Sequence, residues 1–552
     1  YQGVAVSKVT ASAEHTVDFA WDGIAFSRGV RGLALADVSI DRGEYHVGIP
    51  RSLEVARGSA IRGVATGLAA DLYDWRTRNG NQPRPPTLQF LRYSRDFQAE
   101  LWLGANIRGI VEPDPNGGFR YFDTNTTTLA AMAAEWVRYV NHIVPTYRQG
   151  DTISDSSDAA ILNSLTWSSD FPGDAFDTLL APGEAEVPLV QYWEIGNEPT
   201  IGVGSFSVNN SYTLNPAEYH TRYAAVANAI KTENPLVKVG PTLVHAGRED
   251  EHLRILLNDN SLPVDFITYH PYEKMGLLDD PAEITLHLGS IHSHQMQFLN
   301  EIKQIVAESG RDTNAMEYAA TEVNVSNWDT NDSDREARMA HALGTVETIF
   351  SHARLGLVAS HYWIWPTHRW DGTEYPVFKA YQKLRDHLGD TLLSVYAFRD
   401  VRVYVTRDSR TGEIAVWGLN FSEQDSTTVQ LNLADLPPAQ RATLHRLEHY
   451  SGTTSLLSLN ASSEMPGGQV ISVDWNSSEV ELAGLDNFEF QLPAATLSLL
   501  VIEPGLGQVT PEIIDVEGQK TFSVRFNPVR YASGLRYELL SSTNLIDWLA
   551  VA

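Results

Sequence analysis

The stretch VPLVQYWEIGNEP, residues 187–199, decides the fold that this sequence predicts. Its first seven residues, 187–193, read as a buried strand that runs into a polar loop. A helix is expected over residues 216–233, where large apolar side chains recur at steps of three and four positions. Another strand is expected at 237–240. Strand, helix and strand therefore follow one another in this part of the chain.

The same alternation extends over residues 29–389. Strands that alternate with helices form a parallel sheet, and a segment of this length suits a (β/α)8 barrel with insertions. An open doubly wound sheet is the alternative, but no Gly-x-Gly-x-x-Gly turn follows any early strand. The sequence therefore predicts an α/β fold with a TIM barrel. Further strands are expected at 264–269, 318–321 and 357–363, and further helices at 284–308, 334–353 and 375–388.

The pattern changes after residue 389. Apolar and polar residues then alternate with period two in several short runs, which is typical of strands in an antiparallel β-sandwich. We expect this sandwich over residues 390–505 and a short extra β segment over residues 506–552. Residues 1–28 also read as β-structure and could add strands to the sandwich. The period-two runs are 401–405, 413–417, 428–433, 487–492 and 497–502.

Composition excludes several classes of function. The chain has 552 residues, and its 41 Lys and Arg against 69 Asp and Glu give a net charge of −28. A surface this acidic repels nucleic acid and anionic membranes, so neither is an expected partner. The sequence has no cysteine, which excludes thiol nucleophiles, disulfides and thiolate metal sites. Because the chain begins at Tyr1 and not at Met, we expect an exported protein, secreted or periplasmic, whose signal peptide has been removed.

Polar residues gather where the predicted barrel strands end. TIM-barrel enzymes carry their chemistry at the carboxyl ends of the strands. Asn197 and Glu198 follow one strand, His270 and Tyr272 follow another, and Glu322 ends a third. A pair of carboxylates is what cleavage of a glycosidic bond needs, one protonated to assist the leaving oxygen and one ionised to attack the anomeric carbon.

These segments resemble clan A glycoside hydrolases. YWEIGNEP at 192–199 is similar to the Asn-Glu-Pro motif of that clan, and DFITYHPY at 265–272 is similar to its sixth-strand His-x-Tyr. TEVN at 321–324 resembles the seventh-strand nucleophile segment. Residues 374–384 resemble the final barrel helix of families 39, 51 and 79. The resemblance covers about residues 100–390.

The resemblance implies a role for each matching residue. Glu198 corresponds to the general acid/base and Asn197 to the residue that binds the sugar 2-hydroxyl. Glu322 corresponds to the nucleophile, and His270 and Tyr272 to the sixth-strand pair whose tyrosine hydrogen-bonds that nucleophile. The implied mechanism is retaining, with the two carboxyl groups about 5–5.5 Å apart.

Three further residues are expected to bind substrate. Trp363 corresponds to the eighth-strand sugar platform, and Trp370 is expected as a loop subsite because sugars present apolar C–H faces to aromatic rings. Arg62 is the candidate for the arginine that the clan usually has at the end of the second strand, which the sequence does not place securely. Two more carboxylates, Glu194 and Glu317, lie near the motifs, and Glu194 is a rival for the acid.

No cofactor and no metal site are predicted. His292 and His294 are two positions apart and do not meet on one helical face. Residues 329–334 lack the glycine and the terminal glutamate of a calcium loop. His220, His252 and His287 are interpreted as surface or packed histidines.

The predicted function is a retaining glycoside hydrolase that acts on a β-linked plant or algal polysaccharide. We expect endo action, for example on a galactan such as agarose or porphyran, by resemblance to family 86. An exo-acting β-xylosidase or α-L-arabinofuranosidase is the alternative, and a catalytically inactive carbohydrate-binding barrel is the second. An aldolase is disfavoured, since no lysine or phosphate-binding glycine loop ends a predicted strand. The partner is a polysaccharide or oligosaccharide, and the oligomeric state stays open.

Overall fold

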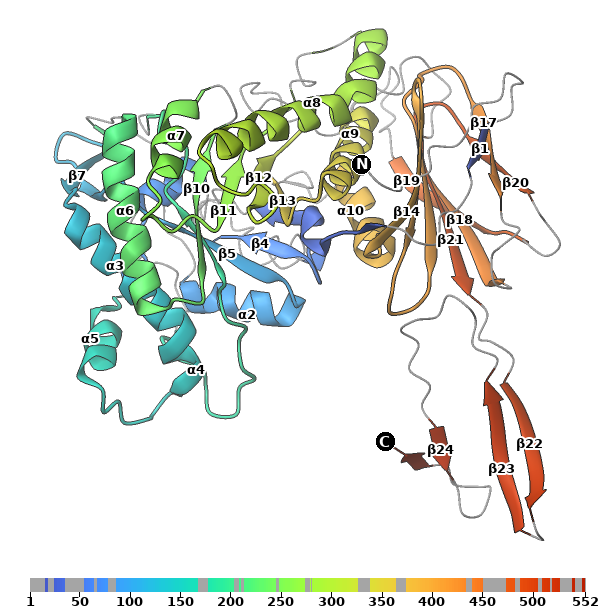
Figure 1. Cartoon of the computed structure of the whole chain (residues 1–552), viewed down its shortest axis with the longest axis horizontal. Coiled ribbons are helices and arrows are strands. Elements are labelled where there is room, and N and C mark those ends of the chain that lie inside the picture. Colours follow the sequence, from blue (N-terminus) through green and yellow to red (C-terminus); the bar gives the residue numbers. More distant parts are fainter. Residues whose placement is uncertain are drawn as a thin grey trace. The chain divides into compact units, whose positions relative to one another are not determined.

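The structure is a computed structural model of the whole chain (Figure 1). It divides into two compact units, which are residues 26–385 with 451–472, and residues 1–25 with 386–450 and 473–552. The described residues are 15–17, 24–34, 54–63, 67–77, 86–166, 177–202, 208–209, 213–244, 248–273, 278, 280–325, 338–363, 374–432, 439–449, 473–481, 487–504, 509–516, 519–526, 539–541 and 549–551.

The larger unit contains a closed barrel of parallel strands, which confirms the predicted TIM barrel. Each strand pairs in parallel with its neighbours, and β13 closes the ring by pairing with β3. In barrel order the strands are β3 (Gly32–Ala34), β4 (Ala60–Arg62), β5 (Glu100–Ala105), β8 (Tyr192–Ile195), β10 (Lys238–Leu243), β11 (Phe266–Tyr269), β12 (Glu317–Val323) and β13 (Ala359–Tyr362).

A long helix follows each barrel strand from β4 onward. Figure 1 shows α6 beside α3 and α8 beside α9 around the strands. These helices are α2 (Thr87–Phe97), α3 (Thr126–Arg138), α6 (Pro216–Glu233), α7 (Asp250–Asn258), α8 (Pro281–Glu308), α9 (Met339–Leu355) and α10 (Pro376–His387). Smaller elements are the 3-10 helices η1 (Arg28–Arg31) and η3 (Gly67–Leu72), the π-helix η4 (Tyr139–Ile143), α4 (Val144–Thr146) and α5 (Ser156–Ser164). A small sheet of β6 (Ile110–Pro113), β7 (Phe119–Asp123) and β9 (Val208–Asn209) was not predicted.

Local chemistry explains where the sequence located elements well and where it did not. Helix α6 has the predicted bounds because Asn215 and Glu218 form a capping box and Pro216 occupies the first helical position. The strand predicted at 187–193 was wrong in its bounds, since β8 begins at Tyr192. Pro188 has no N–H to donate to a ladder, which disfavours a central strand there.

Aromatic rings fill the interior at one end of the barrel. Trp102 and Tyr192 stack with ring centroids 4.0 Å apart, and the edge of Phe266 meets both rings. Alanines on the remaining strands, Ala60 and Ala319 among them, leave room for these rings. Large side chains on β5, β8 and β11 and small ones on β4, β12 and β13 therefore pack together and fill the barrel interior.

The smaller unit contains the predicted β-sandwich. One sheet has the order β19-β18-β21-β16-β15-β14-β2 and the other β1-β17-β20. Valines, leucines and Phe490 from both sheets share one buried core. The strands are β14 (Thr391–Phe398), β15 (Val401–Arg407), β16 (Ile414–Asn420), β17 (Thr427–Asn432), β18 (Ala439–His449), β19 (Val473–Glu479), β20 (Asn487–Leu492) and β21 (Leu497–Pro504), with β1 (His15–Val17) and β2 (Ile24–Ala25).

The two ends of the chain supply the remaining strands. β2 pairs with β14 antiparallel, and β1 pairs with β17 in parallel, an exception to the antiparallel pattern that the sequence predicted. The C-terminal segment has two antiparallel pairs, β22 (Val509–Val516) with β23 (Gln519–Phe526), and β24 (Leu539–Ser541) with β25 (Leu549–Val551). Among the described residues, no helix combines the length and the apolar character that crossing a bilayer requires.

Candidate active site

Glu198 lies in a sharp turn three residues after β8. Gly196 has a φ of +76° and Glu198 a φ of +44°, and a left-handed backbone at a non-glycine residue costs roughly 1–3 kcal/mol. The peptide is held by its surroundings, since the Glu198 N–H donates to the Thr242 carbonyl at 3.2 Å. Its own carbonyl accepts from the Ile201 N–H and from Nη2 of Arg108, both at 2.9 Å. These hydrogen bonds maintain the strained turn. From it, the Glu198 side chain reaches His270, which follows β11.

A buried ion pair stabilises this turn. Arg108, which follows β5, donates from Nε to Oδ2 of Asp71 at 2.8 Å, and both side chains are fully buried. The same Oδ2 accepts the Asn197 N–H at 3.3 Å. Asp71 and Arg108 thus fix the backbone of the Asn-Glu pair. Neither residue was predicted from the sequence, although Arg108 follows β5 and the strand-end rule would have found it had that strand been recognised.

Arg62 joins three barrel strands at the centre of the site. It ends β4 and is buried, and its Nε donates to Oε2 of Glu194 on β8. Nη1 donates to Oε1 of Glu322 on β12 at 2.6 Å, and Nη2 donates to Oδ1 of Asn197 at 2.8 Å. A planar guanidinium with five N–H groups can satisfy these partners at once, which lysine could not.

Glu322 has a donor on each carboxyl oxygen. Oε1 accepts from Arg62, and Oε2 accepts the hydroxyl of Tyr272 at 2.7 Å. Burial and the neighbouring carboxylates raise the pKa of Tyr272 well above its usual value, so its hydroxyl stays a donor. Two donors of this kind fix the orientation of the Glu322 carboxyl group.

His270 lies between the two predicted catalytic carboxyl groups. Its Nδ1 is 2.7 Å from Oε1 of Glu198 and 3.5 Å from Oε2 of Glu322, and its Nε2 is 3.3 Å from Oγ1 of Thr321. Burial lowers the pKa of His270 to about 4, so the ring is neutral at pH 7. A neutral imidazole can position Glu198 without adding a positive charge that would strip it of its proton.

The environment separates the protonation states of Glu198 and Glu194. Burial raises the pKa of Glu198 to about 7, and the positive charges of Arg62, Arg248 and Arg108 offset it only in part. Burial alone would also raise the pKa of Glu194, but the charge and hydrogen bond of Arg62, together with Thr321 and His270, outweigh burial and lower the pKa. Glu198 therefore retains a proton near neutral pH and Glu194 does not, which disfavours Glu194 as the rival acid.

The remaining sequence candidates fall in different places. Trp363 follows β13, is 8% exposed, and meets the Tyr272 ring edge-on at a centroid distance of 6.1 Å. Trp370 lies outside the described residues. Glu317 begins β12, at the opposite end of that strand from Glu322, and pairs with Lys238 at 2.6 Å. The structure thus brings together all the predicted site residues that it describes.

This cluster is built around a guanidinium and not around a metal ion. One ligand-type atom each of Glu198, His270 and Glu322 lie within 4.8 Å of one another, a spacing that could suit an ion. Both oxygens of Glu322, however, already accept from Arg62 and Tyr272. The fixed charge of Arg62 would repel a divalent cation.

Comparisons with known proteins place the fold. No protein-family model matches the sequence, and no curated protein matches it. The α-L-arabinofuranosidase of Thermotoga maritima matches with a TM-score of 0.62 at 16% identity, covering 89% of this chain and 100% of that one. The chain shares the fold of glycoside hydrolases. The family 51 α-L-arabinofuranosidase of Thermotoga petrophila (TM-score 0.60, 16% identity) and the family 44 xyloglucanase of Paenibacillus polymyxa (0.57, 13%) match with the same coverage. The TIM-barrel fold that the clan A resemblance implied is therefore confirmed.

Replacing Arg62 by Met tests whether the guanidinium holds the site together. The change leaves the carboxylates of Glu194 and Glu322 buried without their cation, so we expect the free energy of unfolding to fall by about 3–5 kcal/mol. Urea denaturation measures it. Arg120→Met is the matched control, because its pair with Glu112 is about half exposed and should contribute at most about 1 kcal/mol. Equal losses in the two variants would contradict the central role of Arg62.

Replacing Glu198 by Gln tests the raised pKa without any substrate. Because the folded-state pKa lies above the unfolded value, the stabilising contribution is fully present below about pH 4.5 and is lost as the pH rises through 7. Glutamine cannot ionise, so Glu198→Gln should be more stable than wild type by about 3 kcal/mol at pH 8 and should lose that advantage at pH 4.5. Unfolding at both pH values checks this, with exposed Glu283→Gln as background. A pH-independent difference would contradict it.

Proposed function

We propose that this chain is a retaining glycoside hydrolase, with Glu322 as the nucleophile and Glu198 as the acid/base. The observation that carries the proposal is the spacing of the two carboxyl groups, whose nearest ligand-type oxygens lie within 4.8 Å. Retaining enzymes hold their two carboxyl groups about 5–5.5 Å apart, whereas inverting enzymes leave about 6.5–9.5 Å for a water molecule. The spacing found here supports direct attack by Glu322.

The first half-reaction forms a glycosyl-enzyme. A carboxylate oxygen of Glu322 bonds to the anomeric carbon as the glycosidic C–O bond breaks, and the proton of Glu198 passes to the leaving oxygen. A pKa near 7 suits this donor, because it is protonated near neutral pH and still gives up its proton readily. Arg62 and Tyr272 orient the attacking carboxylate.

The second half-reaction releases the sugar. Glu198 is now ionised and takes a proton from an incoming water molecule, whose oxygen bonds to the anomeric carbon as the bond to Glu322 breaks. Both residues return to their starting forms and the anomeric configuration is retained. The buried amide nitrogen Nδ2 of Asn197 has no hydrogen-bond partner within the described residues, which supports its assignment to a sugar hydroxyl.

The substrate is proposed at the level of two alternatives. The first is the endo-hydrolysis of a β-linked plant or algal galactan, which rests on the sequence alone. An enzyme that acts on such a polysaccharide would be secreted or periplasmic. The second is exo-acting release of α-L-arabinofuranose, which is favoured by the fold shared with the arabinofuranosidases of Thermotoga. An inactive barrel is disfavoured, because both carboxyl groups and their orienting partners are in place.

Two kinds of leaving group distinguish the roles of the two glutamates. Glu198→Gln should lower kcat on a natural glycoside by about 10²–10⁴-fold, but far less on an aryl glycoside whose phenolate leaves without a proton. Glu322→Gln should lose activity on both, because it cannot form the covalent intermediate. Steady-state rates on matched substrates measure the split. Wild-type rates in Glu322→Gln would overturn the nucleophile assignment.

A substrate panel distinguishes the two alternatives. The wild type is incubated with neutral and sulfated galactans, arabinoxylan and aryl α-L-arabinofuranosides, and Glu322→Gln serves as the control. We expect release of arabinose from the aryl glycoside and from arabinoxylan if the exo-acting alternative holds. Release of oligosaccharides from a galactan would establish the endo-acting one. Absence of any release across the panel would favour the inactive barrel.

A further inference from the structure

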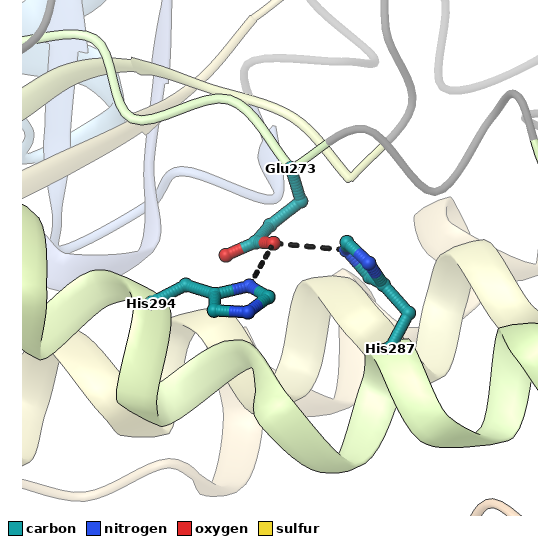
Figure 2. Close-up of side chains that lie close together, drawn as sticks. All are labelled: Glu273, His287 and His294. Carbon is teal, nitrogen blue, oxygen red and sulfur yellow. Dashed lines mark hydrogen bonds and ion pairs between the residues drawn. The ribbon is translucent and has the colours of Figure 1, made fainter.

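A second cluster of ligand-type side chains lies outside the candidate active site (Figure 2). Oε2 of Glu273, in the loop after β11, lies 2.9 Å from Nε2 of His287 and 3.1 Å from Nδ1 of His294. One ligand-type atom of each residue lies within 4.8 Å of those of the other two. The histidines are seven residues apart on α8, which is two helical turns, so both project from the same face. From the sequence, His287 is interpreted as a surface or packed histidine, and its spacing from His294 was not recognised.

The contact between His287 and Glu273 is not that of a hydrogen bond. Nε2 of His287 is buried and has no hydrogen-bond partner among the described residues, although the carboxylate oxygen is only 2.9 Å away. Ligand atoms at about 2.0–2.1 Å from a common tetrahedral ion lie roughly 3.3–3.4 Å apart. The separations of 2.9 Å at His287 and 3.1 Å at His294 are a few tenths of an ångström shorter, so a small outward shift of the side chains would admit an ion.

Buried groups hold the carboxylate in place. Nε2 of Gln295 donates to Oε1 of Glu273 at 2.8 Å, which leaves Oε2 to face the two histidines. Gln295 is fully buried, and its Oε1 is 2.7 Å from Nε2 of His352, whose Nδ1 is 2.8 Å from Oγ of Ser360. Metal-binding carboxylates are typically oriented by such outer hydrogen bonds.

Access from solvent also suits a cation. The Glu273 side chain is 3% exposed and that of His294 is 41% exposed. The cluster is therefore closed on the protein side and open on the side of His294, where an ion and a coordinated water can enter.

We propose that Glu273, His287 and His294 bind a divalent transition-metal ion of the Zn²⁺ type, with water as the fourth ligand. Two imidazole nitrogens and one carboxylate oxygen form a ligand set that suits zinc. The ion would tie the loop after β11 to α8. Because Glu273 follows Tyr272 directly, this tie would steady the hydroxyl that Tyr272 donates to Glu322.

Zinc titration of the full chain tests the proposal. The protein is prepared without a polyhistidine tag, stripped with a chelator, and titrated with ZnCl2 in competition with a chromophoric chelator. Wild type should bind one equivalent per chain, and His294→Ala should bind at least tenfold more weakly. Because the His294 side chain is partly exposed, we expect the His294→Ala chain to fold. His220→Ala is the matched control, because it removes a histidine–carboxylate contact of 3.1 Å to Asp259 elsewhere and should leave the affinity unchanged.

Thermal unfolding gives a second readout. Zinc should raise the unfolding midpoint of wild type and of His220→Ala, but not that of His294→Ala, since an ion that binds the folded state stabilises it by mass action. Absence of a stoichiometric site in the wild type, or equal affinity in wild type and His294→Ala, would overturn the proposal. Neither readout uses turnover, so the result is independent of whether the chain hydrolyses glycosides.

Discussion

The guanidinium of Arg62 is the interaction on which the site depends. It lies at the end of β4 and binds carboxylates on β8 and β12, strands that are far apart in the sequence. Without this cation, Glu194 and Glu322 would be two buried negative charges inside one narrow barrel. With it, Glu194 is held ionised and the carboxyl group of Glu322 is held in one orientation. One side chain therefore links three barrel strands and positions the carboxyl groups on two of them.

The same charge distribution explains why neighbouring glutamates differ. Glu198 has no direct bond from Arg62, and burial leaves its pKa near 7, whereas the pKa of Glu194, four residues earlier, is lowered. Burial and a cation act in opposite directions on a carboxyl group, and distance from the cation decides which prevails. The carboxyl group of Glu198 instead contacts the neutral imidazole of His270, with Oε1 at 2.7 Å from Nδ1.

The fold and much of the site could be predicted from the sequence. Alternating periodicity located α6 to the residue, and the strand-end rule found Glu198, His270 and Glu322. Arg62 was only a weak candidate because β4 is three residues long, too short for a periodic signal. Asp71 was missed because it lies in η3, outside any barrel strand, and Arg108 was missed because the sequence did not reveal β5. The Glu273, His287 and His294 cluster was missed because Glu273 lies outside the helix that carries the histidines, so no single segment shows all three.

The pairing of the first strands with the sandwich has a consequence for synthesis. β1 and β2 leave the ribosome before any barrel strand, yet His15 pairs with Val429 and Ala25 with Thr391. The sandwich cannot be completed until the whole barrel sequence has left the ribosome. Until then, β1 and β2 have no strands to pair with. During synthesis the barrel can therefore close before the sandwich forms. Removing the sandwich strands from the C-terminal part of the chain would also leave β1 and β2 without their pairing partners.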